Sequence, residues 1–142
     1  MNREIKFKAW DSESKEMHYW TLNDLLCRFG EKDYANDNTA SPFFNWMQYT
    51  GLKDKNGVEI YEGDILRYKV LNNKKWFSNW EISFGKYVDY NPSIKEKDMT
   101  KCFGFYLTNY YKHSKPMDYN FFEEDRFEVI GNIYENPELL KQ

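Results

Sequence analysis

The residue types that most often carry catalysis or bind metals are sparse in this chain. Its two histidines, His18 and His113, lack a cysteine, aspartate or glutamate at the spacing of a metal site or a nucleophile–base pair. The two cysteines, Cys27 and Cys102, form no CxxC pair, and we interpret them as small buried side chains, with a disulfide between them left open. We therefore expect no catalytic residue, no metal ligand and no cofactor.

Carboxylates gather in three places, at 11–16, at 62–64 and at 123–125. Acid–base catalysis by a carboxylate pair needs the two groups about 5–9 Å apart across a cleft. The first and third groups are typical of solvated turns. In the second, Asp64 follows Gly63 at the start of a strand-like segment, where its side chain can accept backbone N–H groups. We interpret Asp64 as a structural turn residue and predict that the protein is not an enzyme.

Charge and hydropathy narrow the class of protein further. The 142 residues include 20 Lys and Arg against 23 Asp and Glu, a formal net charge of -3. A dedicated polyanion binder usually carries a strongly basic face, which this balance argues against. No apolar run approaches the ~18 residues of a membrane helix, and the first ten residues lack the apolar stretch of a signal peptide. The expected location is the cytoplasm, with no membrane partner.

Strand signals dominate the chain. Aromatic residues make up 20% of it, a composition that favours sheet over helix. Period-two alternation and short apolar runs predict strands over 3–10, 17–20, 43–50, 58–61, 65–71, 76–84, 102–107 and 127–134. Helical spacing predicts a short helix over 21–30, and Asn136-Pro137-Glu138 is typical of a helix start. Polar, turn-rich segments predict loops over 31–41 and 109–120.

Turn residues at short intervals indicate an antiparallel barrel or sandwich. Asn56-Gly57 predicts a tight turn with two positive φ angles, and Gly63-Asp64 leads into alternating core residues in the manner of SH3-like barrels. We assign structural turn roles to Gly51, Asn56, Gly57, Gly63 and Asp64. The predicted fold is mainly β: an antiparallel SH3-like barrel packed with an N-terminal hairpin and one or two short helices. Segment 102–107 is expected to pair with 76–84.

Three segments resemble a known family. The run 48–65 (QYTGLKDKNGVEIYEGDI) resembles the signature of the YopX family of phage and prophage proteins, 3–11 its opening strand and 128–140 its closing one. The resemblance implies a mainly β protein with an SH3-like barrel, encoded in phages or prophages of low-GC Gram-positive bacteria. It implies no activity, catalytic residue or ligand. We interpret 1–142 as a single domain, with a hairpin and helix part over 1–50 and a barrel part over 51–142.

Three classes of function follow, of which an enzyme is the least supported. The preferred one is a protein-interaction module that binds a host protein, a phage protein or itself. Its expected surface consists of the bulky aromatic residues Trp46, Trp76, Phe77, Trp80, Tyr110 and Tyr111. The alternative that the sequence leaves open is that packed layers cover both faces of these strands, so that the rings belong to the core. The second class is weak single-stranded nucleic-acid binding through loops that combine lysines such as Lys74, Lys75, Lys112 and Lys115 with aromatic rings.

Overall fold

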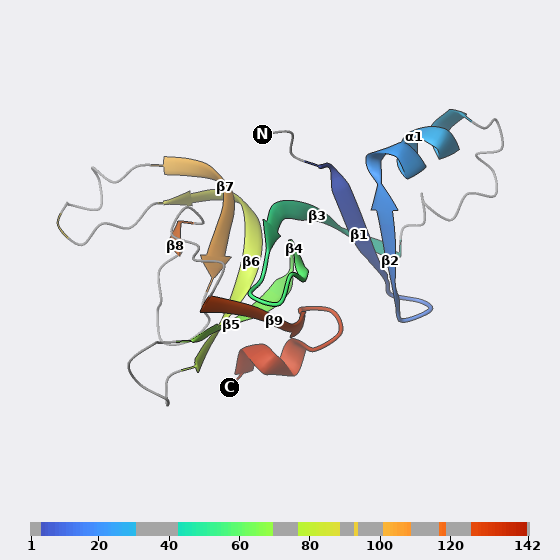
Figure 1. Cartoon of the computed structure of the whole chain (residues 1–142). Helices are drawn as coiled ribbons and strands as arrows, with labels where there is room; N and C mark the ends of the chain where they lie inside the picture. Colours follow the sequence, from blue (N-terminus) through green and yellow to red (C-terminus); the bar gives the residue numbers. More distant parts are fainter. Residues whose placement is uncertain are drawn as a thin grey trace.

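The computed structural model describes residues 4–30, 43–69, 77–88, 93, 101–108, 117–118 and 126–141. In this part of the chain, strands form two antiparallel sheets, accompanied by two short helices (Figure 1). The elements in chain order are β1 (Lys6–Asp11), β2 (Glu16–Thr21), α1 (Leu22–Gly30), β3 (Phe44–Lys53), β4 (Glu59–Tyr61), β5 (Asp64–Lys69), β6 (Phe77–Val88), β7 (Lys101–Thr108), β8 (Met117–Asp118), β9 (Phe127–Asn132) and a C-terminal 3-10 helix (Pro137–Lys141). The predicted mainly β, antiparallel class is confirmed.

Most predicted elements have a counterpart in the structure. The predicted pairings of the first two strands and of 102–107 with 76–84 are confirmed as β1–β2 and β6–β7. The prediction of a loop over 109–120 is wrong at 117–118, because Met117 pairs with Leu107 as strand β8. The predicted loop over 31–41 lies outside the described residues. The interpretation of the two cysteines as buried is wrong, because Cys27 is exposed on α1 and Cys102 is only partly buried in β7, and both thiols are free. Neither described helix is long and apolar enough to span a membrane.

The first sheet has the strand order β2-β1-β3-β4. In its register, Ala9 of β1 lies opposite His18 of β2 and Trp46 of β3. Successive strand residues point to opposite faces of a sheet. One face therefore carries Ala9, His18 and Trp46, and the other carries Lys6, Lys8 and Trp10. Helix α1 follows β2 directly, and its start is capped by reciprocal hydrogen bonds between Thr21 and Asp24.

The second sheet has the strand order β8-β7-β6-β5-β9. One of its faces supplies most of the larger hydrophobic core, which consists of Ile60, Leu66, Ile82, Phe105, Leu107 and Phe127. These six side chains are at most 8% exposed. Trp80, Tyr68, Leu52 and Val129 pack against this core from positions that are only partly buried.

Strand β4 connects the two sheets. Its neighbouring residues point to opposite sides, so that Ile60 enters the larger core while Tyr61 joins a smaller cluster with Met47 and Tyr49 on the first sheet. Figure 1 shows β3 curving from the β1–β2 hairpin towards β4 and the second sheet. Among the described residues, strand pairing does not close into a ring. The SH3-like barrel therefore stays a prediction.

The turn between β3 and β4 differs from the one expected. Gly57 has a φ of 82°, but Asn56 is not among the described residues with positive φ, so the predicted pair of positive φ angles is wrong. Gly57 N instead donates to Asp54 O (2.9 Å), and the Asp54 carboxylate accepts from Asn56 N (2.8 Å) and Val58 N (2.9 Å). An aspartate that binds the backbone two residues onward stabilises this turn without requiring a left-handed asparagine.

Gly63, between β4 and β5, occupies a crowded turn position. Its φ is 75°, and an added Cβ would lie 3.2 Å from Met47 Sδ and 3.3 Å from Ile133 Cγ1. We expect Gly63→Ala to lower the free energy of unfolding by about 2–3 kcal/mol, because left-handed backbone strain and crowding add.

Gly57→Ala is the matched control. Its φ of 82° imposes similar strain, but nothing lies within 4 Å of an added Cβ, so we expect a loss of only about 1 kcal/mol. Urea unfolding of both variants measures the difference. Equal losses would show that the contacts around Gly63 contribute nothing.

Candidate functional site

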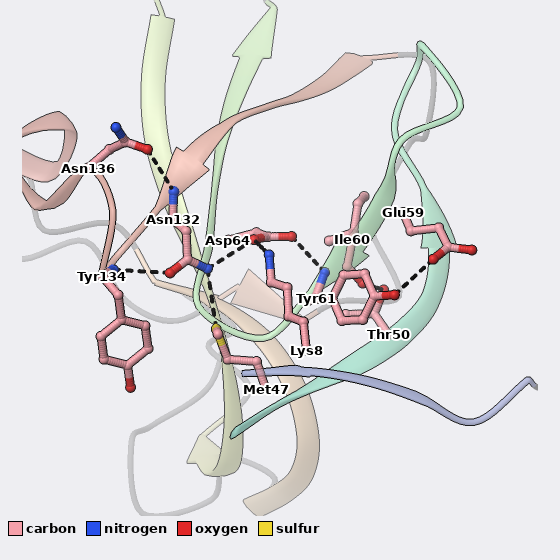
Figure 2. Close-up of polar contacts among 10 residues, drawn as sticks. All are labelled: Lys8, Met47, Thr50, Glu59, Ile60, Tyr61, Asp64, Asn132, Tyr134 and Asn136. Atoms are coloured by element: carbon pink, nitrogen blue, oxygen red, sulfur yellow. Dashed lines mark hydrogen bonds and ion pairs between the residues drawn. The ribbon is translucent and has the colours of Figure 1, made fainter. Parts of the chain in front are cut away.

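A buried ion pair lies where the two sheets meet. The Lys8 ammonium of β1 donates to the Asp64 carboxylate at the start of β5, and the two residues are 6% and 1% exposed (Figure 2). Asp64 also accepts from Asn132 Nδ2 (3.1 Å) and from Tyr61 N (2.8 Å). Four strands, β1, β4, β5 and β9, thus meet at one carboxylate.

Asn132 extends this network towards the C-terminus. Its side-chain amide also lies 3.3 Å from Met47 Sδ, and its side-chain oxygen accepts from Tyr134 N (3.0 Å) (Figure 2). Asn136 accepts from Asn132 N (3.4 Å), just before the 3-10 helix. Since a buried polar group costs free energy unless it is hydrogen-bonded, these contacts let Asn132 stay 1% exposed.

The electrostatics of the network favour a structural role. Burial raises the pKa of Asp64, whereas the Lys8 ammonium and the N–H groups of Tyr61 and Asn132 act to lower it. Both carboxylate oxygens accept hydrogen bonds, and the Lys8 ammonium is already bonded to one of them. The arrangement therefore presents neither a free carboxylate nor a free amine to a substrate.

A second ion pair lies beside the first. Glu59 accepts from Lys6 Nζ (2.6 Å) and from the Tyr61 hydroxyl (2.8 Å). Partial burial acts to raise the pKa of Glu59, but these two hydrogen bonds and the charges of Lys6 and Lys53 together lower it below its ordinary value. Burial and the bond to Glu59 raise the pKa of Tyr61 well above its ordinary value. Tyr61 is therefore a fixed hydrogen-bond donor at neutral pH.

A cavity opens next to these ion pairs. Its volume is about 330 Å³, and its lining includes Lys8, Tyr19, Tyr61 and Glu135, with Val58 and Val129 as apolar members. Pockets that hold small ligands begin at about this size. Within the described residues, no group of three or more histidine, cysteine, aspartate or glutamate side chains could hold a metal ion.

The opposite face of the first sheet carries a cluster of rings. We call Phe7, His18, Trp20, Phe44 and Trp46 the aromatic surface. Trp20 and Trp46 have ring centroids 4.8 Å apart, and both contact Phe44, at 5.7 and 6.0 Å. Ala9 lies at the centre and is fully buried, whereas Trp46 is 38% exposed. The neighbouring Phe43 is 47% exposed.

The predicted surface residues fall in different places. Trp46 belongs to the aromatic surface, but Trp80 packs against the larger core. Phe77 belongs to β6 and pairs with Lys69. Trp76, Tyr110 and Tyr111 lie outside the described residues.

Among the predicted turn residues, three glycines share one property. Gly51, Gly57 and Gly63 all have positive φ angles, and Gly51 lies within β3. Asp64, beside Gly63, accepts the Tyr61 N–H, a contact typical of a turn aspartate.

Sequence reasoning missed Lys8, Asn132 and Asp54. Asp54 is 5% exposed and, besides its turn contacts, accepts from Val129 N (3.0 Å) in β9. Asp54 and Asn132 also make local turn contacts, but a local pattern does not mark the long-range contacts of these three residues, because those partners lie 56 to 75 residues away in the sequence. The one available signal was their position within the segments that resemble the YopX family.

The fold and the junction together define a small, mainly β protein whose two antiparallel sheets are joined by a buried polar network. A family model described as YopX protein matches residues 6–141. The chain therefore belongs to the YopX family, as its three sequence segments predicted.

Comparison with solved structures adds a second finding. The chain is similar to the crystal structure of protein EF1440 from Enterococcus faecalis, with 27% sequence identity, a TM-score of 0.48, and coverage of 96% of this chain and 97% of that one. No curated protein matches the chain.

Proposed function

We propose that this protein is a non-catalytic protein-interaction module that self-associates through its aromatic surface. The observation that carries the proposal is the cluster of five contacting rings on a sheet face that leaves Trp46 38% exposed. Contiguous aromatic patches are typical of protein interfaces, where aromatic residues are enriched. The proposed setting is a phage or prophage, where an accessory protein acts through such contacts.

Charge supports a second copy as the occupant. On this face of β1, β2 and β3, the charged residues are Asp11 and Glu16, which lie opposite each other in the register at the end of the hairpin. Among the described residues, no Asp, Glu, Lys or Arg lies at the centre of the surface, so two copies can pack face to face around a two-fold axis without opposing such charges. The hairpin also leaves β2 at the edge of its sheet, beside the interface.

The lysines described around the first sheet do not supply the cationic track that the nucleic-acid alternative needs. Binding of single strands combines stacked rings with a cationic track along the backbone. Lys6 and Lys8 lie on the opposite face of the sheet, in ion pairs with Glu59 and Asp64. Lys55, in the turn between β3 and β4, pairs with Glu128 at 2.7 Å. The predicted loop lysines Lys74, Lys75, Lys112 and Lys115 lie outside the described residues.

Sedimentation equilibrium over a range of protein concentrations tests self-association. We expect the wild type to approach the mass of a dimer at tens of micromolar, and Trp46→Glu to weaken the dimer at least about 30-fold, as for a central aromatic residue worth 2 kcal/mol or more. Circular dichroism establishes that the variant is folded.

The matched control is Phe103→Glu. Phe103 is 68% exposed on the second sheet, so the same charge replaces an even more accessible ring away from the aromatic surface. We expect this variant to dimerise like the wild type. A wild type that stays monomeric throughout, or a Trp46 variant that dimerises normally, would contradict the proposal.

A further inference from the structure

The cavity between the sheets has the chemistry of a cation site. Its aromatic members, Tyr19 and Tyr61, meet edge to face with centroids 6.2 Å apart and an interplanar angle of 75°. Lys8 Nζ already lies 5.0 Å from the centroid of the Tyr61 ring, so Tyr19, which is 65% exposed, is the lining ring that is open to a further cation. The negative face of an aromatic ring attracts cations, and most strongly where water is partly excluded.

Carboxylates outnumber the free positive charges around the cavity. Lys8 is matched by Asp64, and Glu59 by Lys6. Glu135 is exposed at the cavity, and no residue in the described part of the chain pairs with it. Partial burial, together with the carboxylates of Glu135 and Asp64, raises the pKa of Tyr19, which indicates a negative potential at its hydroxyl.

Apolar side chains complete the lining. Val58 is 48% exposed and Val129 is half-buried, and both line the cavity together with Tyr19 and Glu135. An arginine side chain offers an aliphatic stem for the valines and a planar guanidinium that both stacks on a ring and binds a carboxylate. No other common side chain combines these three properties.

We infer that this cavity binds an arginine side chain of a partner peptide, with the guanidinium between the Tyr19 ring and the Glu135 carboxylate. The cavity lies on the face of β1–β3 opposite to the aromatic surface. The inference is thus independent of self-association, and either can fail without the other.

Nuclear magnetic resonance titration of the full-length, ¹⁵N-labelled protein tests the site. The probe is the peptide acetyl-Gly-Arg-Gly-amide, compared with its citrulline analogue, which keeps the shape but lacks the charge. We expect the arginine peptide to shift the amide signals of Gly131, Asn132 and Glu135, and the citrulline peptide to bind at least about fivefold more weakly. An acetyl-Gly-Glu-Gly-amide probe is expected to leave these signals unchanged.

Three exposed positions supply two variants and a control. Glu135→Gln is expected to weaken binding of the arginine peptide about 2–5-fold, and Tyr19→Leu by a similar factor. Glu138→Gln removes the same charge from the 3-10 helix, away from the cavity lining, and is expected to bind normally. Equal binding of the citrulline peptide, shifts confined to other residues, or no effect of Glu135→Gln would overturn the inference.

Discussion

Asp64→Ala is expected to lower the free energy of unfolding by about 3–5 kcal/mol. Removing one partner of a buried ion pair leaves the other charge buried without compensation. Here the Lys8 ammonium and Tyr61 N would lose their described acceptor, and the Asn132 amide would keep only its contact with Met47 Sδ. Chemical denaturation followed by tryptophan fluorescence measures the loss.

A double-mutant cycle separates the contribution of the ion pair to the free energy of unfolding from the contribution of the other contacts of the Asp64 carboxylate. Asp64→Ala leaves the buried Lys8 ammonium without a carboxylate, and Lys8→Met removes that charge. The double variant is therefore expected to be about 1–3 kcal/mol more stable than the sum of the two single losses predicts. Asp64→Asn serves as the control, since it keeps the shape and one acceptor. If Asp64→Asn is as stable as the wild type, the ion pair does not stabilise the junction.

The same residues show how far sequence reasoning reaches. Alternation in 3–10 predicted a strand, and in β1 Phe7 and Ala9 lie on one face of the sheet while Lys6, Lys8 and Trp10 lie on the other. It did not say which face is buried. Lys8 is 6% exposed because its carboxylate partner lies 56 residues further along the chain, and a local pattern contains no information about that distance.

Strands were more predictable than their assembly for a related reason. A strand is marked by side-chain alternation and flanking turn residues, both of which are local. Pairing order depends on which faces can be buried together. The pairing of β6 with β7 was predicted, whereas β9 lies beside β5 through pairs such as Tyr68 with Phe127, which are far apart in the sequence.

The aromatic residues illustrate the same limit at the candidate surface. Trp46 and Trp80 are both bulky rings in strand-like segments, and their sequence contexts do not distinguish them. Trp46 lies on the outward face of the first sheet, while Trp80 packs against the larger core. Which of these two rings is exposed depends on how the two sheets pack, and that packing is visible only in the structure.

Leu66→Ala is expected to lower the free energy of unfolding by about 2–5 kcal/mol, the range for leucine truncation in a packed core. Leu66 lies in β5, the strand between β6 and β9, and is fully buried among Ile60, Ile82 and Phe127. Truncation would leave a cavity where these strands contribute to one core, and neighbouring side chains refill such space only in part.

Leu26→Ala deletes the same atoms from a different environment. Leu26 lies on α1 and is 59% exposed, so we expect a loss within about 0.5 kcal/mol. Both variants are best unfolded by urea at submicromolar concentration, where self-association does not add to stability. Equal losses would contradict the assignment of the core to the second sheet, whereas the expected difference would show that burial, and not residue type, decides which leucine stabilises the fold.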